Sequence, residues 1–156
     1  MSKRILAAAL CYLVPTFMLG FFWHLVWFKG YYDALAMYRK DVIIPFGLLS
    51  MSIQALLFAW LYERSFARRE GPLLARALAY ALFGAALSWS FTTIAVAAKN
   101  VMSSVRGYLF IESSFTAVQW LLVAPLTAVV LAGPARSSTP IARSNRYLVA
   151  ERRPGE

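Results

Sequence analysis

The sequence predicts an all-α integral membrane protein, a four-helix antiparallel bundle with both termini in the cytoplasm. Its composition, its four long apolar runs and its distribution of Lys and Arg predict this fold. Of the 156 residues, 60% are hydrophobic and 15% charged, and the mean hydropathy is +0.59. Soluble domains average about 25% charged residues, and one of about 150 residues buries only about 70% of its chain surface. Lipid must cover the excess apolar surface, which excludes a soluble enzyme, a disulfide scaffold and a disordered chain.

Four stretches are long enough to cross a membrane. A helix needs about 20 mostly apolar residues to span the hydrocarbon core, and no stretch alternates as a barrel strand would. The first stretch continues too far to be a signal peptide, so we expect it to be a retained span. The four spans form one domain, residues 1–132, and are predicted at Ile5–Phe28, Val42–Tyr62, Leu74–Ala98 and Tyr108–Ala132.

The basic residues predict the orientation. Eleven Lys and Arg lie near the N-terminus, around the second loop and in the tail 133–156, whereas five lie on the opposite side. The positive-inside rule then places both termini in the cytoplasm, here of a bacterial inner membrane, with residues 133–156 as a basic cytoplasmic tail. The net charge of +9 flanks the apolar runs, so we expect membrane lipid and not nucleic acid as the partner of these bases.

Polar residues of the spans gather toward the outer side. Ionisable groups inside a membrane are costly and usually face the bundle or a cavity. Glu112, Thr116 and Gln119 follow one helical face, and Ser50 and Gln54 follow another. We expect an outward-facing polar pocket, and its candidate residues are His24, Gln54, Thr92, Lys99, Glu112 and Gln119.

Two contacts are expected within this pocket. Lys99 and Glu112 end and begin neighbouring helices, with Glu112 in the first turns of the last one, so we expect them to form an ion pair. His24 is expected to hydrogen-bond to Glu112 or Gln54. It is the single histidine and Cys11 the single cysteine, so no metal site, cofactor or intramolecular disulfide is expected.

A structural interpretation stands beside the pocket. Polar side chains also hold membrane helices together. In this interpretation the Lys99 side chain extends to the membrane interface. Glu112 is then an exposed acid in the first turns of its helix, where the helix dipole favours a negative charge. The third run carries small residues at close spacing, which place it in the middle of the bundle or at a dimer contact. These small residues are Ala77, Ala81, Gly84, Ala85 and Ser88.

The segment from Gly20 to Ser50 carries a resemblance. It contains Gly-Phe-Phe-Trp-His-Leu-Val-Trp, then Tyr-Tyr, then Ile-Pro-Phe-Gly-Leu-Leu-Ser. It resembles small uncharacterised bacterial inner-membrane proteins of four helices, which implies the same fold and no particular activity. Four-helix oxidoreductases of the vitamin K epoxide reductase and DsbB types are excluded, because they need paired cysteines.

Three functions follow in order of preference. The first is an accessory or structural subunit packed against a membrane-protein partner, or a homo-oligomer. The second is a small transport or ligand-binding protein that uses the outer pocket. The third is an intramembrane enzyme, for which there is no catalytic motif and only His24, Lys99 and Glu112 as acid–base candidates.

Overall fold

The structure is a computed structural model that describes residues 3–39 and 41–132. Every regular element within these two ranges is helical. The tail predicted at 133–156 lies outside the described residues. In chain order the elements are α1 (Lys3–Phe22), the π-helical turn η1 (Trp23–Trp27), α2 (Lys29–Leu35), α3 (Ile44–Ser65), α4 (Leu73–Trp89), the π-helical turn η2 (Ser90–Ile94), α5 (Ala95–Lys99) and α6 (Val105–Leu131).

Four helices are long and apolar enough to cross a membrane, as the sequence predicts. They run over Lys3–Trp27, Ile44–Ser65, Leu73–Lys99 and Val105–Leu131. The last one begins three residues before the predicted Tyr108, because the hydroxyl of Ser104 caps it by accepting a hydrogen bond from the Gly107 N–H at 3.0 Å. The protein therefore has the build of a multi-pass membrane protein.

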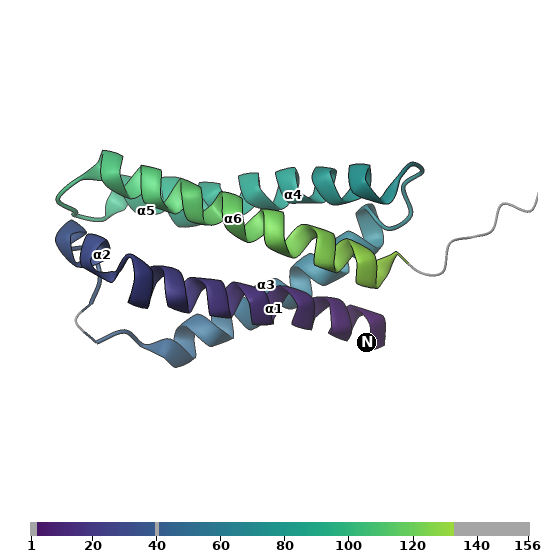
Figure 1. The fold of residues 1–156 in the computed structure, drawn as a ribbon, viewed down its shortest axis with the longest axis horizontal. Helices are drawn as coiled ribbons and strands as arrows, with labels where there is room; N and C mark the ends of the chain where they lie inside the picture. The colour runs from purple at the N-terminus through teal and green to yellow at the C-terminus, as the bar shows by residue number, and fades with distance from the viewer. Residues whose placement is uncertain (1–2, 40, 133–156) are drawn as a thin grey trace, which may run out of the picture.

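The long helices lie lengthwise beside one another (Figure 1). α6 packs against α1 and α4, and α1 also packs against α3, which crosses behind it. The Arg4 guanidinium donates to the Leu131 carbonyl oxygen at 2.7 Å, so the two described ends of the chain meet. The half of the molecule around these ends is called the terminal half, and the opposite half, capped by α2, is called the α2 half.

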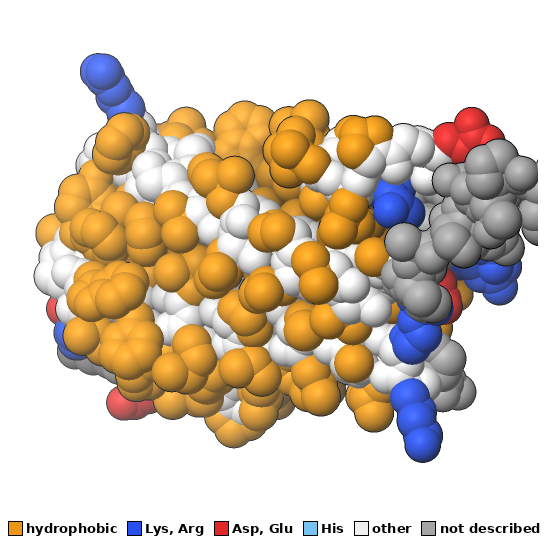
Figure 2. Space-filling model, turned by 45° about the vertical axis from the view of Figure 1, so that its right-hand side comes forward, with side chains coloured by type: hydrophobic (Ala, Val, Ile, Leu, Met, Phe, Trp, Pro, Cys, Tyr) orange, Lys and Arg blue, Asp and Glu red, His pale blue; other side chains and the backbone are white. Residues whose placement is uncertain are grey.

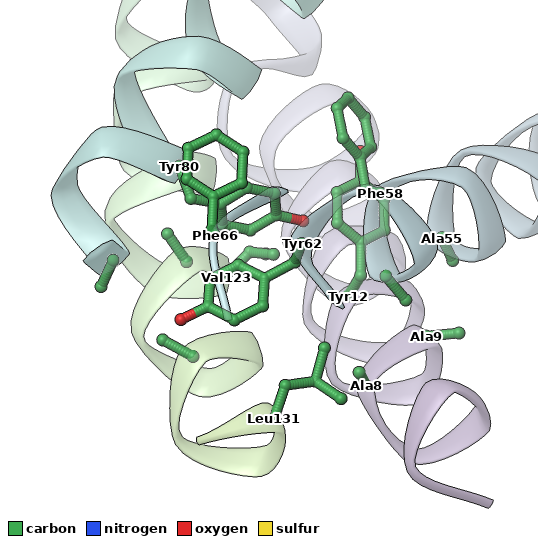
Figure 3. Close-up of a cluster of buried hydrophobic side chains, with 14 of the residues drawn as sticks. Ala8, Ala9, Tyr12, Ala55, Phe58, Tyr62, Phe66, Tyr80, Val123 and Leu131 are labelled. Carbon is green, nitrogen blue, oxygen red and sulfur yellow. The ribbon is translucent and has the colours of Figure 1, made fainter. Parts of the chain in front are cut away.

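The main core occupies the terminal half. Trp120 of α6 is 1% exposed and is surrounded by the rings of Phe58, Tyr80 and Tyr12, with centroids 4.8, 5.3 and 6.0 Å away. Tyr62 packs edge-on against Tyr80 at 4.9 Å. Figure 3 shows these tyrosines and Phe58 gathered between the helices. Aromatic pairs of this geometry stabilise a core beyond their buried area.

The small residues of α4 let α6 approach closely. A Cβ atom added to Gly84 would lie 2.0 Å from Cη2 of Trp120, and the Trp120 Nε1–H donates to the Ser88 hydroxyl at 2.7 Å. The small face of α4 therefore packs within the chain, against α6. α4 is not central, however, because large side chains on its other face, such as Leu78 and Leu82, are exposed.

The outer surface fits a lipid environment. Figure 2 shows hydrophobic side chains over most of the visible face, with basic and acidic side chains near its two ends. Exposed Leu, Val, Phe and Trp side chains occur on all four long helices. In water such a surface would be unfavourable, whereas in a bilayer it needs no polar partner.

Candidate functional site: a polar cavity in the α2 half

Glu112 is the acidic centre of the α2 half. It lies about two turns into α6, and the residue is 6% exposed. The Tyr32 hydroxyl donates to its Oε1 atom at 2.7 Å, and His24 Nε2 lies 3.1 Å from the same oxygen. Hydrogen bonds between the described residues thus reach one carboxylate oxygen from two different elements, α2 and η1. This arrangement fixes the carboxyl group at a depth where an isolated charge would be costly.

The hydrogen bonds of His24 determine how many protons the pair holds. Nδ1 lies 2.9 Å from the Gly20 carbonyl oxygen, which can only accept, so Nδ1 carries a hydrogen and donates it. The contact between Nε2 and Glu112 then needs one more proton, carried by the imidazole or by the carboxyl group. The prediction that His24 hydrogen-bonds to Glu112 or Gln54 is confirmed for Glu112. The pair can therefore shift one proton without losing its hydrogen bond.

The expected ion pair between Lys99 and Glu112 is wrong. Among the described residues the contacts within 4.0 Å between basic and acidic side chains are His24–Glu112 and Lys29–Asp33, and Lys99 is exposed at the end of α5. The error comes from the start of α6. Because α6 begins at Val105, Glu112 lies about 10 Å along the helix axis from its first residue at about 1.5 Å per residue. Glu112 is therefore deeper than the helix end that carries Lys99.

A cavity of about 320 Å³ lies beside this pair. Residues of α1, η1, α3, α4, η2 and α6 line it, so all four long helical segments contribute to its walls. Of the six candidate residues from the sequence, the structure places His24, Gln54, Thr92, Glu112 and Gln119 on its walls, and Lys99 is not among the lining residues.

A chain of amide and hydroxyl groups closes the cavity toward the core. Gln119 Nε2 donates to the Tyr12 hydroxyl at 3.2 Å and to Thr16 Oγ1 at 3.3 Å. The Tyr12 hydroxyl donates to Gln54 Oε1 at 3.1 Å, and Gln54 Nε2 donates to Ser50 Oγ at 3.1 Å. This network joins α6, α1 and α3, so it holds helices together in the way that the structural interpretation expected.

The sequence reasoning missed Tyr32 and the two π-helical turns. Tyr32 lies beyond the first predicted span, which ends at Phe28, yet it is 1% exposed. No apolar run follows this tyrosine, so the sequence pattern does not indicate that its side chain is buried. η1 carries His24 and η2 carries Thr92, so each turn places one cavity residue. π-helical turns are often found at functional sites, because the extra residue changes the direction of side chains.

Burial and charge keep the Tyr32 hydroxyl protonated. Burial raises the pKa of Tyr32 well above its ordinary value, and the negative charge of Glu112 raises it further. Tyr32 therefore remains a hydrogen-bond donor to Glu112 across the physiological pH range. The Tyr32 hydroxyl therefore holds one side of the Glu112 carboxyl group in place.

The described residues contain no group of three or more His, Cys, Asp or Glu side chains placed to hold a metal ion. The chemistry offered by the cavity is that of one acid, one imidazole and several amides and hydroxyls. Comparisons of the chain with protein-family models, curated proteins and solved structures find no match. The cavity itself therefore has to carry any functional conclusion.

Proposed function

We propose that the chain is a small multi-pass protein that binds a polar ligand inside the membrane, at Glu112. The observation that carries this proposal is a buried acid, paired with His24 and Tyr32, on the wall of a cavity of about 320 Å³. Ionisable residues are rare at membrane depth and usually mark a binding site or an ion or proton path. The ligand-binding function thus takes precedence over the subunit function that the sequence favoured.

The hydrogen bonds around the cavity distinguish a ligand-binding site from polar contacts that only hold the helices together. Interhelical packing explains the Gln54–Tyr12–Gln119 network, because each of its hydrogen bonds crosses between helices. On the opposite wall the Thr92 hydroxyl donates to the Ser88 carbonyl of its own helical segment, and bonds from Trp120 and Tyr108 join that wall to α6. That wall faces the cavity without linking α4 to α3. An open space with polar walls is useful to a ligand and adds nothing to packing.

The proposal is tested by native mass spectrometry of the protein purified in mild detergent. We expect the wild-type protein to retain a non-protein mass that Glu112→Gln loses, because the amide cannot accept the same bonds as a carboxylate. Glu63→Gln is the matched control, since Glu63 lies at the terminal end of α3 and does not line the cavity. Equal retained mass in the wild-type and Glu112→Gln proteins would contradict the proposal.

We further propose a bundle of four antiparallel helices with both termini in the cytoplasm of a bacterial inner membrane. The excess of Lys and Arg on the terminal side supports this orientation. In a Cys11→Ala background, an impermeant thiol reagent should label Arg39→Cys and Arg106→Cys in intact cells, and Arg68→Cys only after permeabilisation. Labelling at position 68 but not at 39 would reverse the orientation.

An accessory subunit is the second candidate. Residues 44–50, the first turns of α3, are exposed on every side, and α3 packs mainly on α1. A helix of a membrane-protein partner fits such an unpaired segment. In the same mass measurement this function predicts a co-purifying polypeptide that is retained by Glu112→Gln.

A further inference from the structure

We infer that the ligand is a single-chain amphiphile whose hydrogen-bond-donating head group lies at Glu112 and whose chain lies in a groove between α3 and α4. This inference rests on the proposed function and names its ligand class. It depends on a second, apolar hollow of the molecule that joins the polar cavity.

The apolar groove is continuous with the cavity. It has a volume of about 330 Å³, and its walls include Leu57 and Leu61 of α3 and Leu87 of α4. Gln54, Ser88 and Thr92 line both the groove and the polar cavity. The polar side chains therefore stand at the boundary, with the hydrocarbon wall on one side and Glu112 on the other.

The groove is open because α3 and α4 separate. Near the terminal end they meet through Tyr62 and Tyr80, whose ring centroids are 4.9 Å apart. α3 otherwise packs on α1, and Figure 1 shows it diverging from α4 toward the α2 half. Side chains along the gap, such as Leu57 and Phe91, are exposed to the surroundings. In a membrane those surroundings are lipid, so an amphiphile can enter sideways without passing through water.

The order of polar and apolar walls matches the orientation of a lipid. Glu112 and His24 lie in the α2 half, Gln54 lies midway along α3, and Leu57 and Leu61 lie farther toward the terminal end. An amphiphile of the leaflet on the α2 side has its head at that side and its chain toward the bilayer centre. It can therefore occupy both hollows without reorientation.

The lining charges select the head group. Among the residues that the structure describes, neither Lys nor Arg lines the polar cavity, and Glu112 is the one acid on its walls. A phosphate or carboxylate head would add a second negative charge beside Glu112, and His24, the described lining residue that can become a cation, already contacts Glu112. A head group with O–H or N–H donors can instead bond to Glu112 and to the amide oxygens.

A second apolar groove, between α1 and α3, is the rival location for the chain. It holds about 270 Å³ and shares His24, Tyr38, Gly47 and Met51 with the cavity. We assign the chain to the α3–α4 groove because α1 and α3 pack against each other, whereas α3 and α4 leave an opening. Labelling experiments can separate the two locations.

The experiment uses a monoacylglycerol with a diazirine in the middle of its chain, added to the full-length protein in phosphatidylcholine nanodiscs. After illumination, peptide mass spectrometry maps the cross-links. We expect saturable labelling of the α3 and α4 residues of the groove, near Leu57 and Leu87. Unlabelled monoolein and oleylamine should compete, and oleate should compete about tenfold less well, as one lost charge-assisted hydrogen bond predicts.

Two leucine-to-tryptophan variants of α3 test where the hydrocarbon chain of the ligand binds. Leu57→Trp fills the groove, whereas Leu49→Trp adds the same ring to the same helix outside every hollow described above. The two leucines are matched in exposure, at 60% and 58%. We expect Leu57→Trp to reduce labelling several-fold and Leu49→Trp to leave it unchanged. Equal labelling in the two variants, labelling centred on Phe17 and Leu48 of the rival groove, or stronger competition by oleate would overturn the inference.

The outcome is separable from that of the proposed function. If Glu112→Gln loses a retained mass while the photoprobe does not label the α3–α4 groove, the cavity binds a polar ligand and the amphiphile inference is wrong. If the retained mass is also unchanged, both proposals are wrong.

Discussion

The same four helical segments pack differently in the terminal half and in the α2 half. In the terminal half Trp120 is enclosed by three aromatic rings, and Gly84 allows α6 to approach α4. In the α2 half the helices surround a cavity with Glu112 and His24 on its wall. The terminal half fills the space between its helices with apolar side chains, whereas the α2 half leaves a cavity between them. One half therefore supplies stability, and the other is free to supply a site.

The helical geometry differs in the same way. Both described π-helical turns, η1 and η2, lie in the α2 half, and the segments of the terminal half are α-helical. A π-helical turn is less stable than an α-helical one, so it persists where packing or function compensates for it. Here each turn places a cavity residue, His24 or Thr92.

The largest expected effect comes from filling the close contact of the packed half. Gly84→Ala places a Cβ atom 2.0 Å from Cη2 of Trp120, so the helices must separate or the indole must move. We expect the free energy of unfolding to fall by about 1–3 kcal/mol or more, as for other overpacked cores. Titration with SDS, followed by circular dichroism, measures it.

The matched control lies in the α2 half. Gly47 of α3 has no atom within 4 Å of an added Cβ, so Gly47→Ala should stabilise the helix by roughly 0.5–1 kcal/mol. Equal losses for the two glycine variants would mean that the halves do not differ in packing.

The next largest effect concerns the buried pair. A double-mutant cycle of His24→Gln and Glu112→Gln should give a coupling energy of about 0.5–3 kcal/mol, because the two side chains share a hydrogen bond out of water. The reference pair is Lys29 and Asp33, which are about 60% exposed on α2. Its cycle should give about 0.3–0.5 kcal/mol, the usual value for an exposed helical pair. A smaller coupling for the buried pair would contradict a stabilising hydrogen bond between His24 and Glu112.

A smaller effect is expected at alkaline pH. The pKa of Tyr32 is raised above its ordinary value of 10.0 in the folded protein, so above that pH the unfolded state releases its proton first. The folded state then binds more protons, and the free energy of unfolding falls with pH by at most about 1.4 kcal/mol per unit for one group. Tyr32→Phe should make this fall shallower when unfolding is measured between pH 9 and 11.

Tyr31→Phe serves as its control, because Tyr31 occupies the neighbouring position of α2 and the residue is 43% exposed. If Tyr32→Phe and Tyr31→Phe give the same pH dependence, the buried hydroxyl does not link α2 to the cavity.

The smallest effect should come from Lys99 and Glu112. Since they form no ion pair, the effects of Lys99→Met and Glu112→Gln on unfolding should add to within about 0.5 kcal/mol. A larger coupling, measured in the same SDS titration, would indicate an interaction that the structure does not contain.

The residues of the site show how far sequence reasoning reaches. Glu112, Gln119 and Gln54 could be found because polar groups in an apolar run have few reasons to be there. Tyr32 could not, since an aromatic residue near a membrane interface looks the same whether it is buried or exposed. The expected contact of Lys99 with Glu112 is wrong because the start of α6 depends on the Ser104 cap, a local contact that shifts the depth of Glu112 by about a turn.

The sequence by itself determined that this protein is helical, that four segments are apolar enough to span a membrane, and which side of the spans holds the polar residues. These properties follow from the composition along the chain, because any sufficiently long apolar helix is stable in a lipid bilayer. Only the tertiary structure decided that Glu112 pairs with His24 and Tyr32, that α3 and α4 separate, and that a cavity joins an apolar groove between them. Those features depend on helix starts, π-helical turns and single contacts such as that of Gly84 with Trp120, which arise between segments distant in the sequence and leave no periodic pattern in it.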